Sequence, residues 1–379
     1  MRLATIVCAI FVALGAATVA WAAFSSVTQN PSTFSANPDL SNPTVTGSIV
    51  AKTSGLTPGK IRQGGQYYVY ANATDAGNPA SGISSVTANL GSFDTGQTAV
   101  AMTTAGGPWT VNAVSYSYRS ALLTANTPLT TGSTFVYTVT ANDNASHTSG
   151  ATNFNVQIET YAEVINAMTG LVSYWKLNEA AGTAAADSQG TNTGTYTNTP
   201  TLGQAGALTG DTSTSVQFNG TNEYINVPDA ASLDITAQIT IEAWFRSNTL
   251  INNSTILSKG STTGYWLQRN GNTNPAQFGT NGTTNPTLNG TVSINNGAWH
   301  HIAVVYNGAN KYIYIDGVQD VTVAATGNIS TNNQALRIAD NAQATGRFWA
   351  GWLDEVAIYN VGLTPAQVLD HFNAGRGTG

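Results

Sequence analysis

The chain has 379 residues, which is enough for more than one ordinary domain. Only 8% of the residues are charged and the formal net charge is −6, so the polar surface must come largely from uncharged side chains. These values exclude the basic patch that a nucleic-acid-binding protein needs, and they are typical of exported β-proteins.

The N-terminus predicts export. One Arg is followed by an apolar run and then by Ala20-Trp21-Ala22, the small-residue pattern of a signal-peptide cleavage site. We expect a signal peptide over residues 1–22, with an uncleaved membrane anchor as the alternative. Cys8, the only cysteine, lies inside this segment, so the exported chain has no disulfide. It should be secreted or held at the cell surface, with no membrane span after signal removal.

Residues 23–43 are rich in Ser, Asn and Pro and are expected to form a spacer. Short alternating runs then continue to about residue 160. In "STFVYTVTAND", Phe135, Tyr137 and Val139 share one face, which is the period of a β-strand. The segments "TDAGNPASGISSVTANL" and "VTANDNASHTSG" resemble bacterial immunoglobulin-like repeats, which implies a spacer domain with the β-sandwich fold over residues 44–160.

A second module follows a predicted linker at residues 161–169. Its strands include "QITIEAWFRS" and "WHHIAVVYN", and Asp316-Gly317 predicts a type I′ hairpin turn. One helix is expected in "TPAQVLDHFNAG", with Thr364 as N-cap and Gly375 as the stop.

Five blocks in this module occur in a characteristic order: "GLVSYWKLNEAAGTAAADSQGTNTGTY", "VQFNGTNEYINVP", "SLDITAQITIEAWF", "WHHIAVVYNGANKYIYIDGV" and "GWLDEVAIYNVGLTPAQVLDHF". Together they resemble the laminin-G-like, concanavalin A-like jelly rolls of bacterial exported proteins, over residues 170–375. The resemblance implies an all-β chain in which an immunoglobulin-like β-sandwich precedes a jelly roll, whose concave surface often binds glycans or proteins.

Asp354 and Glu355 are adjacent carboxylates in an otherwise apolar strand. Strand period puts them on opposite faces, so we expect that they do not form a glycosidase pair. The resemblance implies a second role, a structural calcium ion held by Asp354, Asp187 and, more weakly, Asn219. In the third interpretation Asp354 accepts backbone N–H groups and Glu355 is a solvated charge.

No catalytic motif stands out. Glu242 has no carboxylate partner on its strand, and His300 and His301 are consecutive and face opposite ways, which favours packing and hydrogen bonding over metal chelation. The chain contains no zinc-protease, nucleophile-elbow or phosphate-loop pattern.

Aromatic and amide side chains are the candidates for ligand binding, because rings stack on sugar faces and amides read sugar hydroxyls. The stretch "GYWLQRNGNTN" holds such a mixture, and "GRFWAG" adds an arginine and an indole. The predicted ligand residues are Tyr265, Trp266, Gln268, Asn270 and Trp349.

The sequence therefore predicts an exported, non-enzymatic protein whose jelly roll binds a carbohydrate or an extracellular protein. Two alternatives stay open. One is a polysaccharide-active enzyme, for which loss of turnover in Glu242→Gln would be evidence. The other is a structural surface or matrix component without a discrete ligand.

Overall fold

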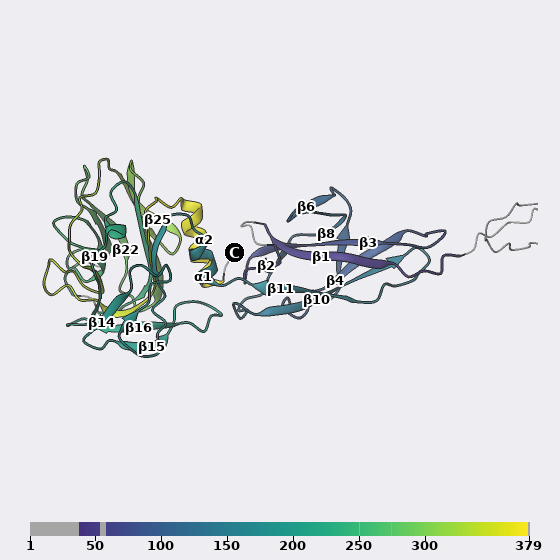
Figure 1. Ribbon diagram of the computed structural model, residues 1–379, viewed down its shortest axis with the longest axis horizontal. Coiled ribbons are helices and arrows are strands. Elements are labelled where there is room, and N and C mark those ends of the chain that lie inside the picture. The colour runs from purple at the N-terminus through teal and green to yellow at the C-terminus, as the bar shows by residue number, and fades with distance from the viewer. Residues whose placement is uncertain (1–37, 54–57, 250, 274, 378–379) are drawn as a thin grey trace, which may run out of the picture. The chain divides into compact units, whose positions relative to one another are not determined.

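The computed structural model describes residues 38–53, 58–249, 251–273 and 275–377. The predicted signal peptide, Cys8 and most of the predicted spacer lie outside these ranges. Among the residues that are described, no helix combines the length and the hydrophobicity that are needed to cross a bilayer. The prediction of an all-β chain is confirmed, since strands dominate both modules (Figure 1).

In the described part of the N-terminal module, one nine-stranded sheet forms, with strand order β1-β3-β8-β5-β4-β10-β11-β2 and β9 paired to β3. Tyr137, Val139 and Ala141 point into its core, as the strand period predicted. The curled sheet is consistent with a β-sandwich, and the immunoglobulin-like assignment stays a prediction. The strands are β1 (Thr44–Lys52), β2 (Lys60–Ile61), β3 (Gln66–Thr74), β4 (Ile83–Asn89), β5 (Val100–Thr103), β8 (Tyr118–Ser120), β9 (Leu123–Thr124), β10 (Thr134–Asp143) and β11 (Thr152–Ile158), and a separate hairpin joins β6 (Trp109–Val111) and β7 (Val114–Tyr116).

A short helix, α1 (Tyr161–Asn166), occupies most of the segment that the sequence predicted as a linker. It forms because Thr160 and Glu163 make a capping box, in which each side chain accepts from the other residue's backbone N–H. Tyr161 and Ile165 are buried against the C-terminal module.

The C-terminal module packs two sheets face to face. Within the described residues the first sheet has order β15-β16-β27-β18-β23-β24-β25, with β12 paired to β27, and the second has order β13-β14-β17-β26-β19-β20-β21-β22. The first sheet consists of β12 (Leu171–Trp175), β15 (Thr201–Ala205), β16 (Thr214–Asn219), β18 (Ile239–Arg246), β23 (Trp299–Tyr306), β24 (Asn310–Ile315), β25 (Val318–Ala324) and β27 (Ala350–Tyr359).

The second sheet faces the first across the larger core of this module. Ile241 and Phe245 of the first sheet meet Leu257 and Phe278 of the second there, which is the arrangement of a jelly roll. The second sheet consists of β13 (Ala184–Ala185), β14 (Gly194–Thr197), β17 (Tyr224–Val227), β19 (Thr255–Lys259), β20 (Tyr265–Arg269), β21 (Pro275–Thr280), β22 (Thr287–Ser293) and β26 (Leu336–Ile338), and one turn of 3-10 helix, η1 (Ala231–Leu233), follows β17.

The predicted hairpin turn and the predicted helix near the C-terminus both form. Asp316 and Gly317 have φ angles of 52° and 76°, so the predicted type I′ turn is confirmed. The predicted helix is α2 (Pro365–Arg376), with Thr364 as N-cap, but its left-handed C-cap is Gly377. The prediction that Gly375 ends the helix is therefore wrong: a Cβ there would lie 2.3 Å from Trp244, so Gly375 provides close packing.

Helices α1 and α2 lie beside each other (Figure 1) and enclose a second core on the outer face of the first sheet. Trp244, Tyr359 and Val368 belong to this core. The first sheet is thus buried on both faces near the helices, which explains the apolar character of β18 and β27 on both of their faces.

Candidate functional site

Asp354 and Glu355 do not alternate as the sequence analysis predicted. Leu353 and Val356 both enter the core between the sheets, and Glu355 has a φ of 53°. The register with β18 shifts at this point, so β27 carries one extra residue. This β-bulge turns both carboxylates to the outer face of the first sheet.

Both carboxylates are buried there. Asp354 Oδ2 accepts from the backbone nitrogen of Ala207 at 2.8 Å, and Glu355 accepts from the Tyr174 hydroxyl. Burial, followed by the charge of Glu355, raises the pKa of Asp354 well above its usual range, and burial raises the pKa of Glu355 to about 8. The solvated role considered for Glu355 is wrong, because its exposed fraction is 2%, whereas the backbone acceptance expected of Asp354 is confirmed.

Glu242 lies in the same layer, and its partners come from other strands and from helix α2. Its carboxylate is 3.0 Å from His371 Nδ1 and 3.3 Å from His301 Nε2, and it accepts from the Tyr359 hydroxyl. Burial alone would raise the pKa of Glu242, but the two imidazoles lower it well below its usual range. His300 binds Asp316 instead, so the two histidines face opposite ways as predicted.

None of these carboxylates can reach a substrate. Glu242 and Asp354 have no exposed surface, and helices α1 and α2 cover this face. The cluster is therefore a buried polar layer that orders the second core.

A second cluster of polar side chains lies on the opposite side of the module, on the outer face of the second sheet. Its exposed or half-buried members are Asn289, Asn270, Gln277 and Arg347, whereas Trp266 and Gln268 are buried. Gln277 is its centre. Its Oε1 accepts from Trp266 Nε1 at 3.3 Å and from Gln268 Nε2 at 2.8 Å, while its Nε2 donates to Asn270 at 3.3 Å and to Asn289 at 2.9 Å. Three of the five predicted ligand residues, Trp266, Gln268 and Asn270, thus meet around a glutamine that the sequence analysis did not select.

We call this surface the amide face. Arg347 extends it by donating to Gln268 Oε1 at 3.2 Å. An indole and a guanidinium can only donate, so Trp266 and Arg347 together fix the orientation of both glutamine amides. The amide face comprises Trp266, Gln268, Asn270, Gln277, Asn289 and Arg347.

Strand geometry brings these side chains together. Gln268 pairs with Gln277, which pairs with Asn289, so three adjacent strands align their amides in one row. Trp266 pairs with Gly279, and its ring occupies the space where a Cβ would stand. A signal was present in the sequence, since Gln277 alternates with the buried Phe278 and Ala276 in a strand-like run.

The other two predicted ligand residues are elsewhere. The Tyr265 ring lies in the core between the sheets, where its hydroxyl donates to the carbonyl oxygen of Leu233. Trp349 has no exposed surface and packs edge-to-face on Phe245. Tyr265 belongs to the inward-facing set of β20 and Trp349 is buried just before β27 begins, so neither ring adds surface to the amide face.

The predicted calcium ligands do not converge on one site. Asn219 pairs with Ala350, four residues from Asp354, which is roughly 13 Å along an extended strand. Strand β12 separates Asp187 from β27, because Trp175 bridges to both Asp187 and Val356. The Asp187 carboxylate already accepts three backbone N–H groups. These three residues therefore do not fit a shared ion.

Among the described residues, one other set of metal-ligand side chains is close together: Asp39, Asp143 and His147, with ligand atoms within 4.8 Å of one another. Asp39 accepts from the backbone nitrogens of Ser41 and Ser81, and Asp143 binds His147 through both its backbone and its ring. Every carboxylate oxygen of this set has a partner within the protein.

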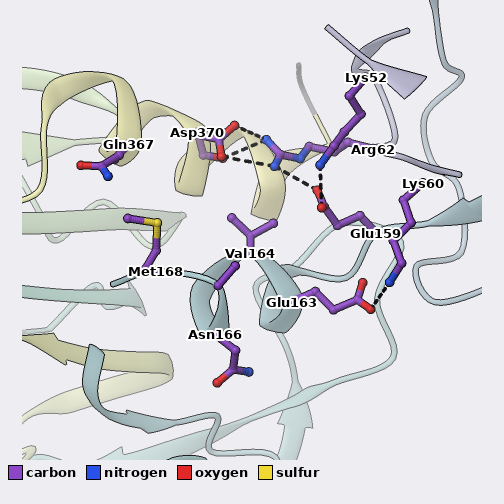
Figure 2. A pocket seen from close by; sticks show the side chains of 11 residues that line it. Lys52, Lys60, Arg62, Glu159, Glu163, Val164, Asn166, Met168, Gln367 and Asp370 are labelled. Atoms are coloured by element: carbon purple, nitrogen blue, oxygen red, sulfur yellow. Dashed lines mark hydrogen bonds and ion pairs between the residues drawn. The ribbon is translucent and has the colours of Figure 1, made fainter. Parts of the chain in front are cut away.

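A pocket of about 890 Å³ lies where α1 and α2 meet the strands of the N-terminal module (Figure 2). Arg62 bridges Glu159 at 3.1 Å and Asp370 at 2.5 Å, and Lys52 binds Glu159 at 2.5 Å. Because Lys60 also pairs with Glu163, the three cations and three carboxylates of the pocket neutralise one another. The arrangement holds the junction together and leaves no charge for a ligand.

Comparison with known proteins agrees with this architecture. Residues 219–369 match the family model described as the concanavalin A-like lectin/glucanases superfamily. This confirms the resemblance on which the jelly-roll prediction rested. A search of curated proteins finds no match.

Solved structures with a similar fold include three proteins of different kinds. One is the binding domain of Paraclostridial mosquitocidal protein 1, with 16% identity, a TM-score of 0.45 and coverage of 54% of this chain and 52% of that chain, so this chain spans about half of its length. Another is domain 4 of AbnA, a GH43 extracellular arabinanase from Geobacillus stearothermophilus, in complex with arabinotriose, with 23% identity, a TM-score of 0.42 and coverage of 53% of this chain and 97% of that chain. The third is Trypanosoma rangeli sialidase in complex with difluorosialic acid, with 15% identity, a TM-score of 0.42 and coverage of 63% of this chain and 42% of that chain.

Proposed function

We propose that this protein, whose C-terminal module is a concanavalin A-like jelly roll, is an exported, non-enzymatic binding protein that recognises carbohydrate through the amide face. The observation that carries the proposal is the Gln277 network. Its side chains stand on adjacent strands and hold one another, so little conformational entropy is lost when a ligand binds.

The network also indicates which ligand atoms would bind. The carbonyl oxygens of Asn270 and Asn289 accept from Gln277, so their NH₂ groups remain to donate outward. Asn289 is exposed and Asn270 half-buried. A ligand with acceptor oxygens, such as the hydroxyl and ring oxygens of a sugar, fits this pattern.

The burial of the candidate catalytic carboxylates supports a binding role over catalysis. Glycosidases need two carboxyl groups that flank an accessible bond, and Glu242, Asp354 and Glu355 are all enclosed. Turnover of a polysaccharide by the purified chain would contradict this part of the proposal.

The test is binding of the purified chain to an array of neutral glycans and matrix proteins, repeated with Gln277→Ala. Removing the central amide leaves Trp266 and Gln268 without their shared acceptor, so we expect affinity to fall by about tenfold or more. Gln319→Ala, which truncates an exposed glutamine of the first sheet, is the matched control and should change nothing.

Three outcomes would redirect the proposal. Equal binding by wild type and Gln277→Ala would exclude the amide face. Binding only to proteins would replace carbohydrate with an extracellular protein as the ligand. No binding at all, together with concentration-dependent self-association, would favour a structural surface or matrix component.

In this proposal the N-terminal module is a spacer and the chain acts outside the cell or at its surface. A structural calcium ion stays a prediction, and it would need ligands other than the set Asp187, Asn219 and Asp354. Thermal unfolding with calcium and with a chelator tests it, since an ion that binds only the folded state must raise Tm.

A further inference from the structure

A row of side chains crosses the outer face of the first sheet, on the side of the jelly roll opposite to the amide face. Thr201 pairs with Gln217, Gln217 with Trp352, Trp352 with Arg246, and Arg246 with Trp299. Directly paired residues in neighbouring strands point to the same side of a sheet. We call this set the cross-strand row: Thr201, Gln217, Trp352, Arg246 and Trp299.

The row lies on the outer face because its neighbours point inward. Leu353 and Phe245, each next to a member of the row, pack in the core between the sheets. The adjacent outer row is covered, since Phe372 of α2 stacks on Trp244 with ring centroids 5.9 Å apart. In the cross-strand row Thr201 is exposed and the other four members are half-buried, and Trp299 also packs against the edge of the second core.

The polar groups of the row have no protein partner in the part of the chain that the structure describes. The guanidinium of Arg246 lies 4.6 Å from the centre of the Trp352 ring, but it makes no ion pair or hydrogen bond there, unlike Arg62. The Gln217 amide and the indole nitrogens of Trp352 and Trp299 also lack partners. None of these atoms is among the buried polar atoms without a partner, so they face solvent.

We propose that the cross-strand row binds an acidic polysaccharide, which would lie across the strands. An arginine fork pairs with a carboxylate in a planar, bidentate geometry, and Arg246 has this fork open. The two indoles stand two strand spacings apart, about 10 Å, on either side of the cation, and can contact the faces of sugar rings that flank a charged one.

The row favours an acidic glycan over a protein partner. A protein interface centres on apolar anchors that fill desolvated pockets, whereas these five side chains form a shallow strip of indole, guanidinium, amide and hydroxyl groups. A cation that stacks on Trp352 but has no ion pair among the described residues matches a ligand that carries both a carboxylate and a sugar face. This site and ligand class are independent of the neutral carbohydrate proposed for the amide face.

The experiment measures binding of the purified chain to polygalacturonate, alginate and hyaluronate at a low salt concentration of about 50 mM, at which ion pairs are weakly screened. Methyl-esterified polygalacturonate provides the same backbone without charge. We expect binding to at least one acidic polymer, none to the ester, and weakening as salt is added.

Variants assign the binding to the row. We expect Arg246→Gln to lower the affinity by about tenfold or more, and Arg246→Lys to retain part of it because charge remains while the fork is lost. Trp352→Ala should also weaken binding, with circular dichroism showing an intact fold. Arg376→Gln removes an exposed arginine on α2 and is the matched control.

The proposal would be overturned if none of the three acidic polymers bound. Binding that Arg246→Gln leaves unchanged, or binding that Gln277→Ala reduces as much as Arg246→Gln does, would overturn it too. Because neutral glycans report on the amide face and acidic ones on the row, failure of one site does not imply failure of the other.

Discussion

The side chains of Asp354 and Glu355 lie on the same face of β27, although they are neighbours in sequence. The bulge at Glu355 places both carboxyl groups in the buried layer beneath the helices, where Asp354 binds Ala207 and Glu355 binds Tyr174. Two adjacent buried acids that form no ion pair with any described residue favour the neutral, protonated form.

Stability should therefore fall as pH rises through the neutral range. The folded protein keeps a proton on Glu355 up to a pKa of about 8, whereas an unfolded glutamate loses it near 4.3, so unfolding releases this proton between these limits. The free energy of unfolding therefore decreases as pH rises from about 4.3 to about 8, by up to about 1.4 kcal/mol per pH unit. Urea denaturation of wild type and Glu355→Gln between pH 5.5 and 8.5 measures it.

The glutamine variant keeps a neutral side chain at every pH and should show a shallower dependence than wild type. Parallel slopes for the two proteins would mean that Glu355 does not bind the proton.

Glu242→Gln should destabilise the fold without affecting any turnover. The substitution leaves His371 and His301 next to a neutral amide in a buried layer, and breaking a buried pair from one side costs about 3–5 kcal/mol. The free energy of unfolding from urea titration is the measurement. A loss below about 1 kcal/mol would show that the carboxylate does not hold this layer together.

Gly279→Ala should disturb the amide face through Trp266. A Cβ at this position would lie 1.9 Å from the indole, so the ring must move and its bond to Gln277 must break, at a cost of about 1–3 kcal/mol. We expect a shift of the tryptophan fluorescence and weaker glycan binding. Gly47→Ala is the matched control, because an added Cβ there meets no atom within 4 Å and its φ, like that of Gly279, is not positive.

Arg62→Gln should loosen the junction between the modules. Arg62 is buried and binds both Glu159 and Asp370 (Figure 2), and the variant leaves Glu159 with Lys52 as its only cation. We expect about 1–3 kcal/mol of destabilisation and separation of one calorimetric transition into two. A single transition at the wild-type Tm would show that the bridge is dispensable.

The sequence predicted the elements whose signals are local. The hairpin at Asp316-Gly317 and the start of α2 at Thr364 each depend on a few adjacent residues, and the order of the five sequence blocks indicated the jelly roll. The helix α1 was not predicted because the capping box of Thr160 and Glu163 begins a helix of only six residues.

The sites depend on relationships that sequence spacing does not contain. The alternation around Gln277 predicts an outward-facing side chain, but its position beside Gln268 follows from the pairing of β20 with β21. His371, which binds Glu242, comes from a helix 129 residues away along the chain. Tyr265 and Trp266 were predicted together, but strand alternation puts one in the core and the other on the amide face.

The extra residue in β27 makes the length of this strand as important as its composition. Before the bulge β27 pairs with β16, and after it with β12, while Leu353 and Val356 stay in the same core. Deleting either Asp354 or Glu355 would remove the bulge and leave Val356 and Ile358 facing inward, with one acid instead of two in the outer layer. A strand of the present length without the bulge would instead turn Val356 and Ile358 outward and interchange the two cores that share this strand.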